Sequence, residues 1–459
     1  MNRFNSVDPF AQTRRSFLSE LGGSVGLLGL SSYLHAVDAP TVSPAAGKPH
    51  FKPRAKRVIF LFMAGGPSQL DMFDPKPVLE KHAGKRPGAA DLRTERVTGG
   101  LLPSVFKFRP GGKSGLPVSD LLPNIRECVD ELCLLRSVYA TNPNHSPAAN
   151  FMASGRIDAT HPGIGSWVSY GLGSENADLP GFVSLGGGFG QVGFERSGYL
   201  PGQFQATRVS ATESDPEKMI RHLRNPAIGP DDQKRQLDAL QAFNHNHAVA
   251  NGNDPQLEAR VRAMETAFRM QTAAGEAFDT RREPLRIREM YGQGEFARGC
   301  LLARRLVERG VRFVQLSNGG WDHHSGINGE LKKKCGEIDR PIAALLKDLR
   351  QRGLLEDTLV IWGGEFGRTP VSENGDGRDH NHYGFTMWMA GGGVKGGIAH
   401  GATDEFGFKA EENRVAVHDL HATILHLLGL DHEKLTYRYS GRDFRLTDVH
   451  GHVVKDILA

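Results

Sequence analysis

Acidic residues and histidines flank expected strands at four places in this 459-residue chain. They occur in the segments GGPSQLDMFD (65–74), GGWDHH (319–324), GGEFGR (363–368) and RDHNHYG (378–384). In an open α/β sheet, ligands bind in the crevice beyond the carboxyl ends of the strands. Asp, Glu and His are also the usual ligands of hard and borderline divalent metals. The pattern therefore predicts a metal-dependent hydrolase with its site at one edge of a sheet.

Two of these segments place carboxylates directly after an apolar run. Asp322 and His324 follow an expected strand at 311–316, and Asp71 follows one at 57–64. Glycines between strand and acid let the backbone turn sharply toward the edge of the sheet. Each segment also has a plainer explanation, in which the Asp caps a turn and the histidine bonds to backbone. We therefore expect Asp71, Asp322 and His324 as metal ligands, with turn capping as the alternative.

The other two segments add a carboxylate and a pair of histidines. Glu365 follows an expected strand at 358–362, and Arg368 lies three residues on, where a guanidinium could bind an anionic oxygen. A simple Glu–Arg ion pair is the alternative. His380 and His382 precede an expected strand at 385–390 and face the same side if the backbone is extended. We expect Glu365, His380 and His382 to complete the metal site.

Strands and helices alternate on both sides of a polar segment. The rhythm predicts a largely parallel sheet that is covered by helices on both faces. The segment at about 210–295 is polar and carries an apolar stripe at helical spacing, which predicts a helical insertion packed on the sheet. A partner-binding helix pair is the alternative. The expected helices of the main domain are 296–309, 338–351 and 418–428.

The N-terminal residues have the features of an export signal. TRRSFL (13–18) matches a twin-arginine pattern, a mildly apolar run follows at 21–34, and Val-Asp-Ala at 37–39 offers a cleavage site. The apolar run is shorter than the roughly 20 residues that cross a bilayer. We expect a signal at 1–39, a linker at 40–56, one domain at 57–459, and a periplasmic or extracellular location without a stable membrane span.

Composition excludes several classes of protein. A net charge of +4 is too small to indicate binding to nucleic acid. The four cysteines form no CxxC pair, so a thiolate zinc site is not expected, and we interpret them as buried free thiols. The glycine runs at 186–190 and 391–393 lack the context of a nucleotide-binding motif.

The segment LPNIRECVDELCLLRSVYATNPNHSPAANFMASGR (122–156) resembles the nucleophile region of sulfatases in the alkaline-phosphatase superfamily. More closely, the chain is similar over nearly its full length to DUF1501, a twin-arginine-exported family with the motifs GGPSQ-D-FDPKP, GGWD-x-H and GEFGRTP. The resemblance implies an alkaline-phosphatase-like three-layer α/β/α sandwich. It also implies a divalent metal (zinc, manganese or calcium) and an anionic ester substrate such as a sulfated or phosphorylated glycan.

The departures from the sulfatase pattern concern the nucleophile itself. His145 stands where sulfatases have the cysteine that becomes formylglycine, and Ala149 stands where they have an arginine. The resemblance therefore implies catalysis by a metal-activated water or by Ser146, with His145 as a ligand or a general acid–base group. We expect hydrolysis of a sulfate or phosphate ester. The alternatives are a non-catalytic sulfatase-like binding protein and a metal carrier.

Overall fold

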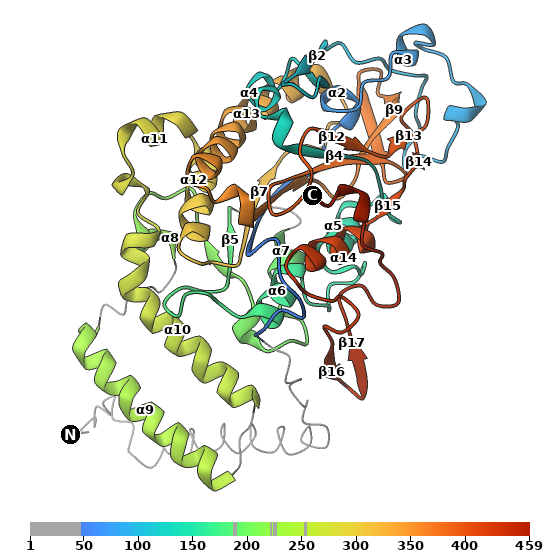
Figure 1. Ribbon diagram of the computed structural model, residues 1–459. Helices are drawn as coiled ribbons and strands as arrows, with labels where there is room; N and C mark the ends of the chain where they lie inside the picture. Colours follow the sequence, from blue (N-terminus) through green and yellow to red (C-terminus); the bar gives the residue numbers. More distant parts are fainter. Residues whose placement is uncertain (1–46, 187–190, 221–222, 224–226, 252–254) are drawn as a thin grey trace, which may run out of the picture. The chain divides into compact units, whose positions relative to one another are not determined.

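The computed structural model describes residues 47–186, 191–220, 223, 227–251 and 255–459 (Figure 1). The expected export signal lies outside these residues. The described residues fall into two compact units, one that runs as far as Thr436 and resumes at Arg445, and one that contains Tyr437–Phe444. In the second unit the described part is a hairpin of β16 (Tyr437–Tyr439) and β17 (Arg442–Phe444).

A nine-stranded sheet forms the centre of the larger unit. Its order is β12-β4-β11-β8-β1-β7-β5-β6, with β15 also paired to β4. Every pairing is parallel except the two made by β11, which confirms the expected α/β fold with a largely parallel sheet. The strands are β1 (Arg57–Ala64), β4 (Leu132–Tyr139), β5 (Phe182–Leu185), β6 (Thr207–Val209), β7 (Phe313–Gly319), β8 (Thr358–Gly363), β11 (Phe385–Ala390), β12 (Ile398–His400) and β15 (Val415–Ala416).

The central strand β1 is apolar on both faces because helices cover both faces of the sheet. Ile59 and Leu61 belong to the same apolar core as residues of α12 (Glu295–Glu308) and α13 (Ile327–Gln351). Phe60 and Phe62 point to the other face, where their ring centroids lie 5.2 and 4.8 Å from that of Phe194. The period of two in a strand thus divides one apolar run between two layers of helices.

The helices form two groups. Figure 1 shows α12 beside α13, and Asp339 of α13 accepts hydrogen bonds from the backbone of α4 (Pro123–Glu127). The other helices of the main domain include α5 (His145–Ser154), α6 (Ile164–Leu172), α7 (Gln191–Glu195) and α14 (Val417–Leu427). Within the described ranges, none of the helices combines the length and apolar character that crossing a bilayer requires.

Most of the segment expected as a helical insertion is helical. It contains α8 (Pro216–Met219), α9 (Pro230–Asn251), α10 (Pro255–Ala277) and α11 (Leu285–Tyr291). The apolar stripe is not wholly buried, since Met264 of α10 is 64% exposed. The described part of the expected linker packs along the domain, where Arg54 and Ala55 donate backbone hydrogen bonds to Leu427. All four cysteines are buried free thiols, as expected.

Candidate metal centre

The site begins where three parallel strands end side by side. In the sheet register, Ala64 of β1 lies opposite Gly319 of β7, and Phe62 lies opposite Gly363 of β8. The loops that follow these strands therefore meet at one edge. Gly65 has a φ of +119°, and a Cβ there would lie 2.7 Å from the Asp322 backbone nitrogen. Only glycine allows the two loops to approach this closely.

The histidines that precede β11 reach the same edge because β11 runs antiparallel to its neighbours. After β8 the chain forms a hairpin of β9 (Gly367–Glu373) and β10 (Gly377–Asn381). Its turn contains Asn374 and Gly375, both with positive φ. A Cβ on Gly377 would lie 2.0 Å from the carbonyl carbon of His324, so glycine lets the hairpin pack directly on the loop after β7.

Three imidazoles converge on one carboxylate oxygen. The Nε2 atoms of His145, His324 and His380 lie 3.2, 2.8 and 3.1 Å from Oδ1 of Asp322. The Nε2 atoms of His324 and His380 are 3.0 Å apart. One potential ligand atom from each of the four residues falls within 4.8 Å of the others. Four such donors around a common point form the candidate metal centre.

The opposite nitrogen of each imidazole is held by an acceptor. Nδ1 of His145 lies 2.6 Å from Oε1 of Glu365, and Nδ1 of His380 lies 2.7 Å from the backbone oxygen of Pro143. Nδ1 of His324 contacts the carboxylate of Glu373. A proton held on Nδ1 leaves the Nε2 lone pair facing the cluster. Metal-binding histidines almost always have such a partner on the second nitrogen.

The carboxylates also control the charge of the cluster. Burial alone would lower the pKa of His145, but hydrogen bonds with Asp322 and Glu365 raise it to about 9. Burial opposes ionisation of Asp322, yet its hydrogen bonds with the three imidazoles hold its pKa well below the usual range. The pKa of His324 is likewise raised against the effect of burial, by Asp322 and Glu373. In the absence of a metal, the raised pKa values of His145 and His324 favour the protonated imidazoles, which compensate the negative charge of the carboxylates.

Three of the four side chains in the cluster are largely buried, and the fourth is partly exposed. The side chains of His380, His324 and His145 are 3, 13 and 19% exposed, whereas that of Asp322 is 43% exposed. A ligand can therefore approach the cluster from the side of Asp322.

The structure brings part of the expected site together directly. Asp322, His324 and His380 belong to the cluster with His145. Glu365 lies behind His145, fully buried, where it also accepts a 2.9 Å hydrogen bond from the Gly65 backbone nitrogen. Glu365 thus orients a candidate ligand in this structure.

Arg368 also lies behind the cluster. Its buried guanidinium donates to the backbone oxygens of Gly65, Gly66 and Arg378, and to Oδ1 of Asp322 at 2.6 Å. These contacts fix the carboxylate that the three imidazoles share. The expected contact of Arg368 with a substrate stays a prediction.

The remaining expected residues lie elsewhere. Asp71 is buried in an ion pair with Arg378 at 2.9 Å, which holds its pKa below the usual value despite burial. His382 lines a neighbouring cavity, and burial lowers its pKa to about 4. Ser146 is exposed in the first turn of α5, next to His145. Among the described residues, neither Asp71 nor His382 belongs to a group of potential metal ligands, and the role of Ser146 as a nucleophile stays a prediction.

The sequence analysis did not identify two carboxylates that lie at the site. Glu373 contacts Nδ1 of His324, and Glu95 contacts Nδ1 of His380. The Asn374-Gly375 pair is a hairpin signal that could have placed Glu373 opposite Gly377, as the register has it. No comparable signal marks Glu95, which lies in a long irregular segment far from the other site residues in sequence.

The donor set fits a divalent metal of borderline hardness. Three imidazole nitrogens and one carboxylate oxygen match the ligands that zinc and similar transition metals prefer. Calcium takes only oxygen ligands, six to eight of them, so this cluster does not suit it. His145, Asp322, His324 and His380 could together hold one such metal, which would supply Lewis acidity at this edge of the sheet.

Comparison with solved structures found distant similarity over most of the chain. The PsFucS1 sulfatase from Pseudoalteromonas sp. is 13% identical, with 83% of this chain and 69% of that chain covered and a TM-score of 0.36. A protein in the alkaline phosphatase superfamily from Vibrio parahaemolyticus is 12% identical (85% and 71% covered, TM-score 0.34). The alkaline phosphatase from the Antarctic bacterium TAB5 is 11% identical (82% and 99% covered, TM-score 0.34).

A family model also matches most of the chain. A search of curated proteins found no match. The model described as "Protein of unknown function (DUF1501)" matches residues 55–458, which confirms the resemblance inferred from the GGPSQ, GGWD and GEFGRTP motifs. This chain therefore belongs to the DUF1501 family.

Proposed function

We propose that this protein is a metal-dependent hydrolase of sulfate or phosphate esters. The observation that carries the proposal is the convergence of three Nε2 atoms on Oδ1 of Asp322, at 2.8–3.2 Å. A buried cluster in which each imidazole has its second nitrogen held is a costly arrangement without a ligand, because the Nε2 atoms face one another. A metal bound by His145, Asp322, His324 and His380 would supply Lewis acidity for hydrolysis.

The position of α5 supports an anionic substrate. His145 and Ser146 lie in the first turn of this ten-residue helix, and its N-cap Asn144 makes no side-chain capping bond. The backbone N–H groups of a helix N-terminus attract anions, and here they lie beside the cluster. The nucleophile is a water molecule or the exposed hydroxyl of Ser146. His145, held at Nδ1 by Glu365, is placed to bind metal or to move a proton at Nε2.

We also propose that the protein works in the periplasm or outside the cell. The twin-arginine pattern at 13–18 supports this location, because that route exports folded proteins. A protein folded in the cytoplasm can acquire its metal before export.

Metal analysis followed by a substrate screen tests the proposal. Protein from its native host should contain about one equivalent of a transition metal, and His324→Ala should lose most of it. Loaded protein should hydrolyse aryl sulfates or aryl phosphates, and Asp322→Ala should abolish the activity. Glu127→Ala is the control, because Glu127 is exposed and, within the described ranges, forms its ion pair with Lys347. Turnover that is unaffected by loss of the metal would contradict the proposed mechanism.

A metal-binding protein without catalysis is the second candidate. The observation that favours it is the engagement of Arg368, whose three side-chain nitrogens all donate to carbonyl or carboxylate oxygens of the protein. No other arginine contacts Asp322 among the described residues. Full metal occupancy without turnover of either ester class would select this candidate.

A further inference from the structure

A cavity of about 530 Å³ lies next to the metal centre. Three chain segments contribute residues both to the wall of the cavity and to the metal centre or its contacts. Pro143 contacts His380, and Tyr139 lines the cavity. In the same way Glu95 contacts His380 and Leu92 lines the cavity. The cavity is therefore a few residues from the cluster along every segment that the two share.

The third shared segment indicates the distance between the cavity and the metal centre. His380 belongs to the cluster, while His382, two residues on, lines the cavity. Two residues of extended chain span about 7 Å, which is roughly the width of one sugar ring. The backbone oxygen of His382 accepts a 2.8 Å hydrogen bond from Ala140, so the two walls are joined at this point. The segment that carries His380 of the cluster thus continues directly into the wall of the cavity.

Aromatic and charged side chains line this cavity. Tyr139 and Tyr383 supply rings, and the ring centroids of Tyr383 and His382 are 4.1 Å apart. The guanidinium carbon of Arg414 lies 4.2 Å from the centroid of Tyr139. Lys409 supplies a second cation. Among the described residues, neither Arg414 nor Lys409 has its side chain in an ion pair with a carboxylate.

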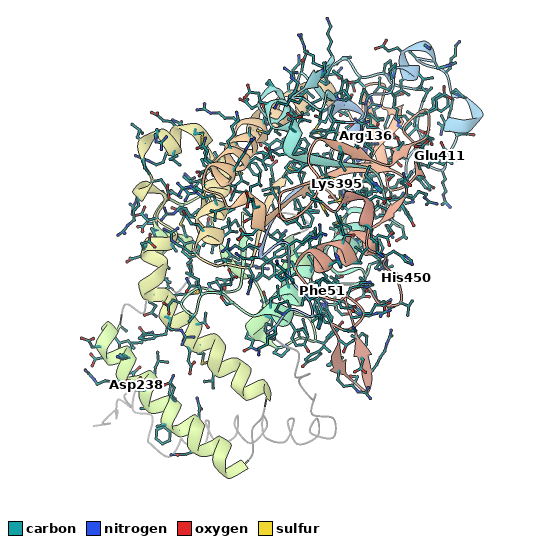
Figure 2. The ribbon with its side chains drawn as sticks, viewed as in Figure 1. Phe51, Arg136, Asp238, Lys395, Glu411 and His450 are labelled. Atoms are coloured by element: carbon teal, nitrogen blue, oxygen red, sulfur yellow. The ribbon has the colours of Figure 1, made fainter. Side chains whose placement is uncertain are left out.

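Glu411 completes the wall of the cavity, and its negative charge limits which kind of anion can bind there. Its residue lies in β14 (Ala410–Glu412), and Figure 2 labels it at the outer edge of the molecule. A carboxylate repels a ligand that is negative throughout but accepts hydrogen bonds from hydroxyl groups. Rings beside cations and a hydroxyl acceptor suit a polar ring with a single negative substituent.

We infer that this cavity is a subsite for an anionic sugar unit, with Arg414 and Lys409 binding its charged substituent and Tyr139 and Tyr383 packing against its ring. The inference rests on the proposed function, since the subsite would hold the part of the substrate next to the ester. Charge-assisted hydrogen bonds from arginine supply the selectivity for a charged over a neutral sugar.

Binding of three sugars to the full chain tests the subsite. Glucose 6-sulfate and glucuronate distinguish a sulfate from a carboxylate source of the charge, and neutral glucose is the reference. By isothermal titration, both charged sugars should bind at least about tenfold more tightly than glucose. Arg414→Gln should remove that preference, and Lys409→Gln should reduce it. Arg350→Gln is the matched control, since Arg350 lines a separate cavity beside Glu131, at the other end of β4.

Different outcomes separate this inference from the proposed function. Equal binding of all three sugars, or a preference that survives Arg414→Gln, overturns the subsite even if aryl esters are hydrolysed. Equal competition by inorganic sulfate overturns the assignment of a sugar, because the ring would contribute nothing. A preference for charged sugars that depends on Arg414, in protein that hydrolyses no ester, supports the subsite and contradicts the hydrolase.

Discussion

Replacing Glu365 by Gln should weaken metal binding, although Glu365 is not one of the four residues of the candidate metal centre. The carboxylate accepts hydrogen bonds from the Gly65 nitrogen at 2.9 and 3.2 Å and holds Nδ1 of His145 at 2.6 Å. A glutamine keeps one acceptor oxygen and gains an NH₂ group. With its oxygen at the position of Oε1, the amide keeps both donors but places its NH₂ group 3.2 Å from the Gly65 nitrogen. Turned the other way, the NH₂ group faces both Gly65 and His145.

The size of the effect follows from this conflict. If the amide NH₂ faces His145, the imidazole must carry its proton on Nε2, where it blocks the lone pair that would bind the metal. Loss of a partner behind a metal-binding histidine typically weakens affinity by about 10–100-fold. That range corresponds to about 1.4–2.7 kcal/mol, since tenfold is about 1.4 kcal/mol. Because the buried amide can turn its oxygen toward His145 and keep that contact, we expect a value near the lower end.

Competition with a chromophoric chelator measures the affinity directly. Glu373→Gln should give a similar loss through His324, and Glu127→Gln should give none. A second readout is the pKa of His145 in the metal-free protein, which Glu365 helps to raise to about 9 and which should fall in the variant. A Glu365→Gln protein that folds and binds metal within twofold of wild type would refute the reasoning.

Three further predictions concern the pH dependence, the core and the export of the protein. The pKa of His145 is raised to about 9 in the folded metal-free protein. Its contribution to stability should therefore be complete below about pH 6.5 and lost as the pH rises through 9. Chemical denaturation at several pH values measures this. Over the same interval metal affinity should rise, because protons compete for the imidazole; pH-independent binding would contradict this. Asp71→Asn should cost about 3–5 kcal/mol of unfolding free energy by leaving buried Arg378 without its partner, yet metal content per folded molecule should not change. Replacing both Arg14 and Arg15 by Lys should retain the protein in the cytoplasm, and undiminished export on cell fractionation would show another route.

The buried strands of the sheet could be predicted from the sequence because they are apolar on both faces, whereas the short edge strands β6, β12 and β15 were not expected. The apolar run at 57–64 corresponds residue for residue to β1, and the run at 385–390 corresponds to β11. Helices were predicted with less precise ends. The helix expected at 338–351 begins at Ile327, since its first turns carry Lys332–Lys334 and other polar residues that conceal the apolar side.

The direction of β11 could not be predicted, although it decides the site. An apolar run of six residues has the same pattern in either direction. In a parallel strand the residues before β11 would lie at the opposite edge of the sheet, far from Asp322. The β9–β10 hairpin returns the chain to the edge where β8 ends, so that His380, near the end of β10, joins the cluster before β11 begins.

Pairings between distant segments were also beyond the sequence. Asp71 has the features of a ligand when only its neighbours are considered, but its partner Arg378 lies 307 residues further along. The local pattern of an acidic residue after a strand predicts a ligand, but it cannot reveal a partner that is so distant in sequence. Residues that orient the cluster, such as Glu365, resemble ligands in sequence because both kinds of residue end up at the same edge.

The central position of β1 has a consequence for biosynthesis. Its partners β7 and β8 are synthesised far later, and Gly65 at its end bonds to Glu365, 300 residues downstream. On the ribosome, a strand with seven consecutive buried residues must remain unpaired until most of the chain has emerged. Contacts of such high sequence separation form slowly, and the waiting strand is prone to aggregate. We therefore expect production of this protein to depend on chaperones that hold the nascent chain, and slower translation or lower temperature to raise its yield.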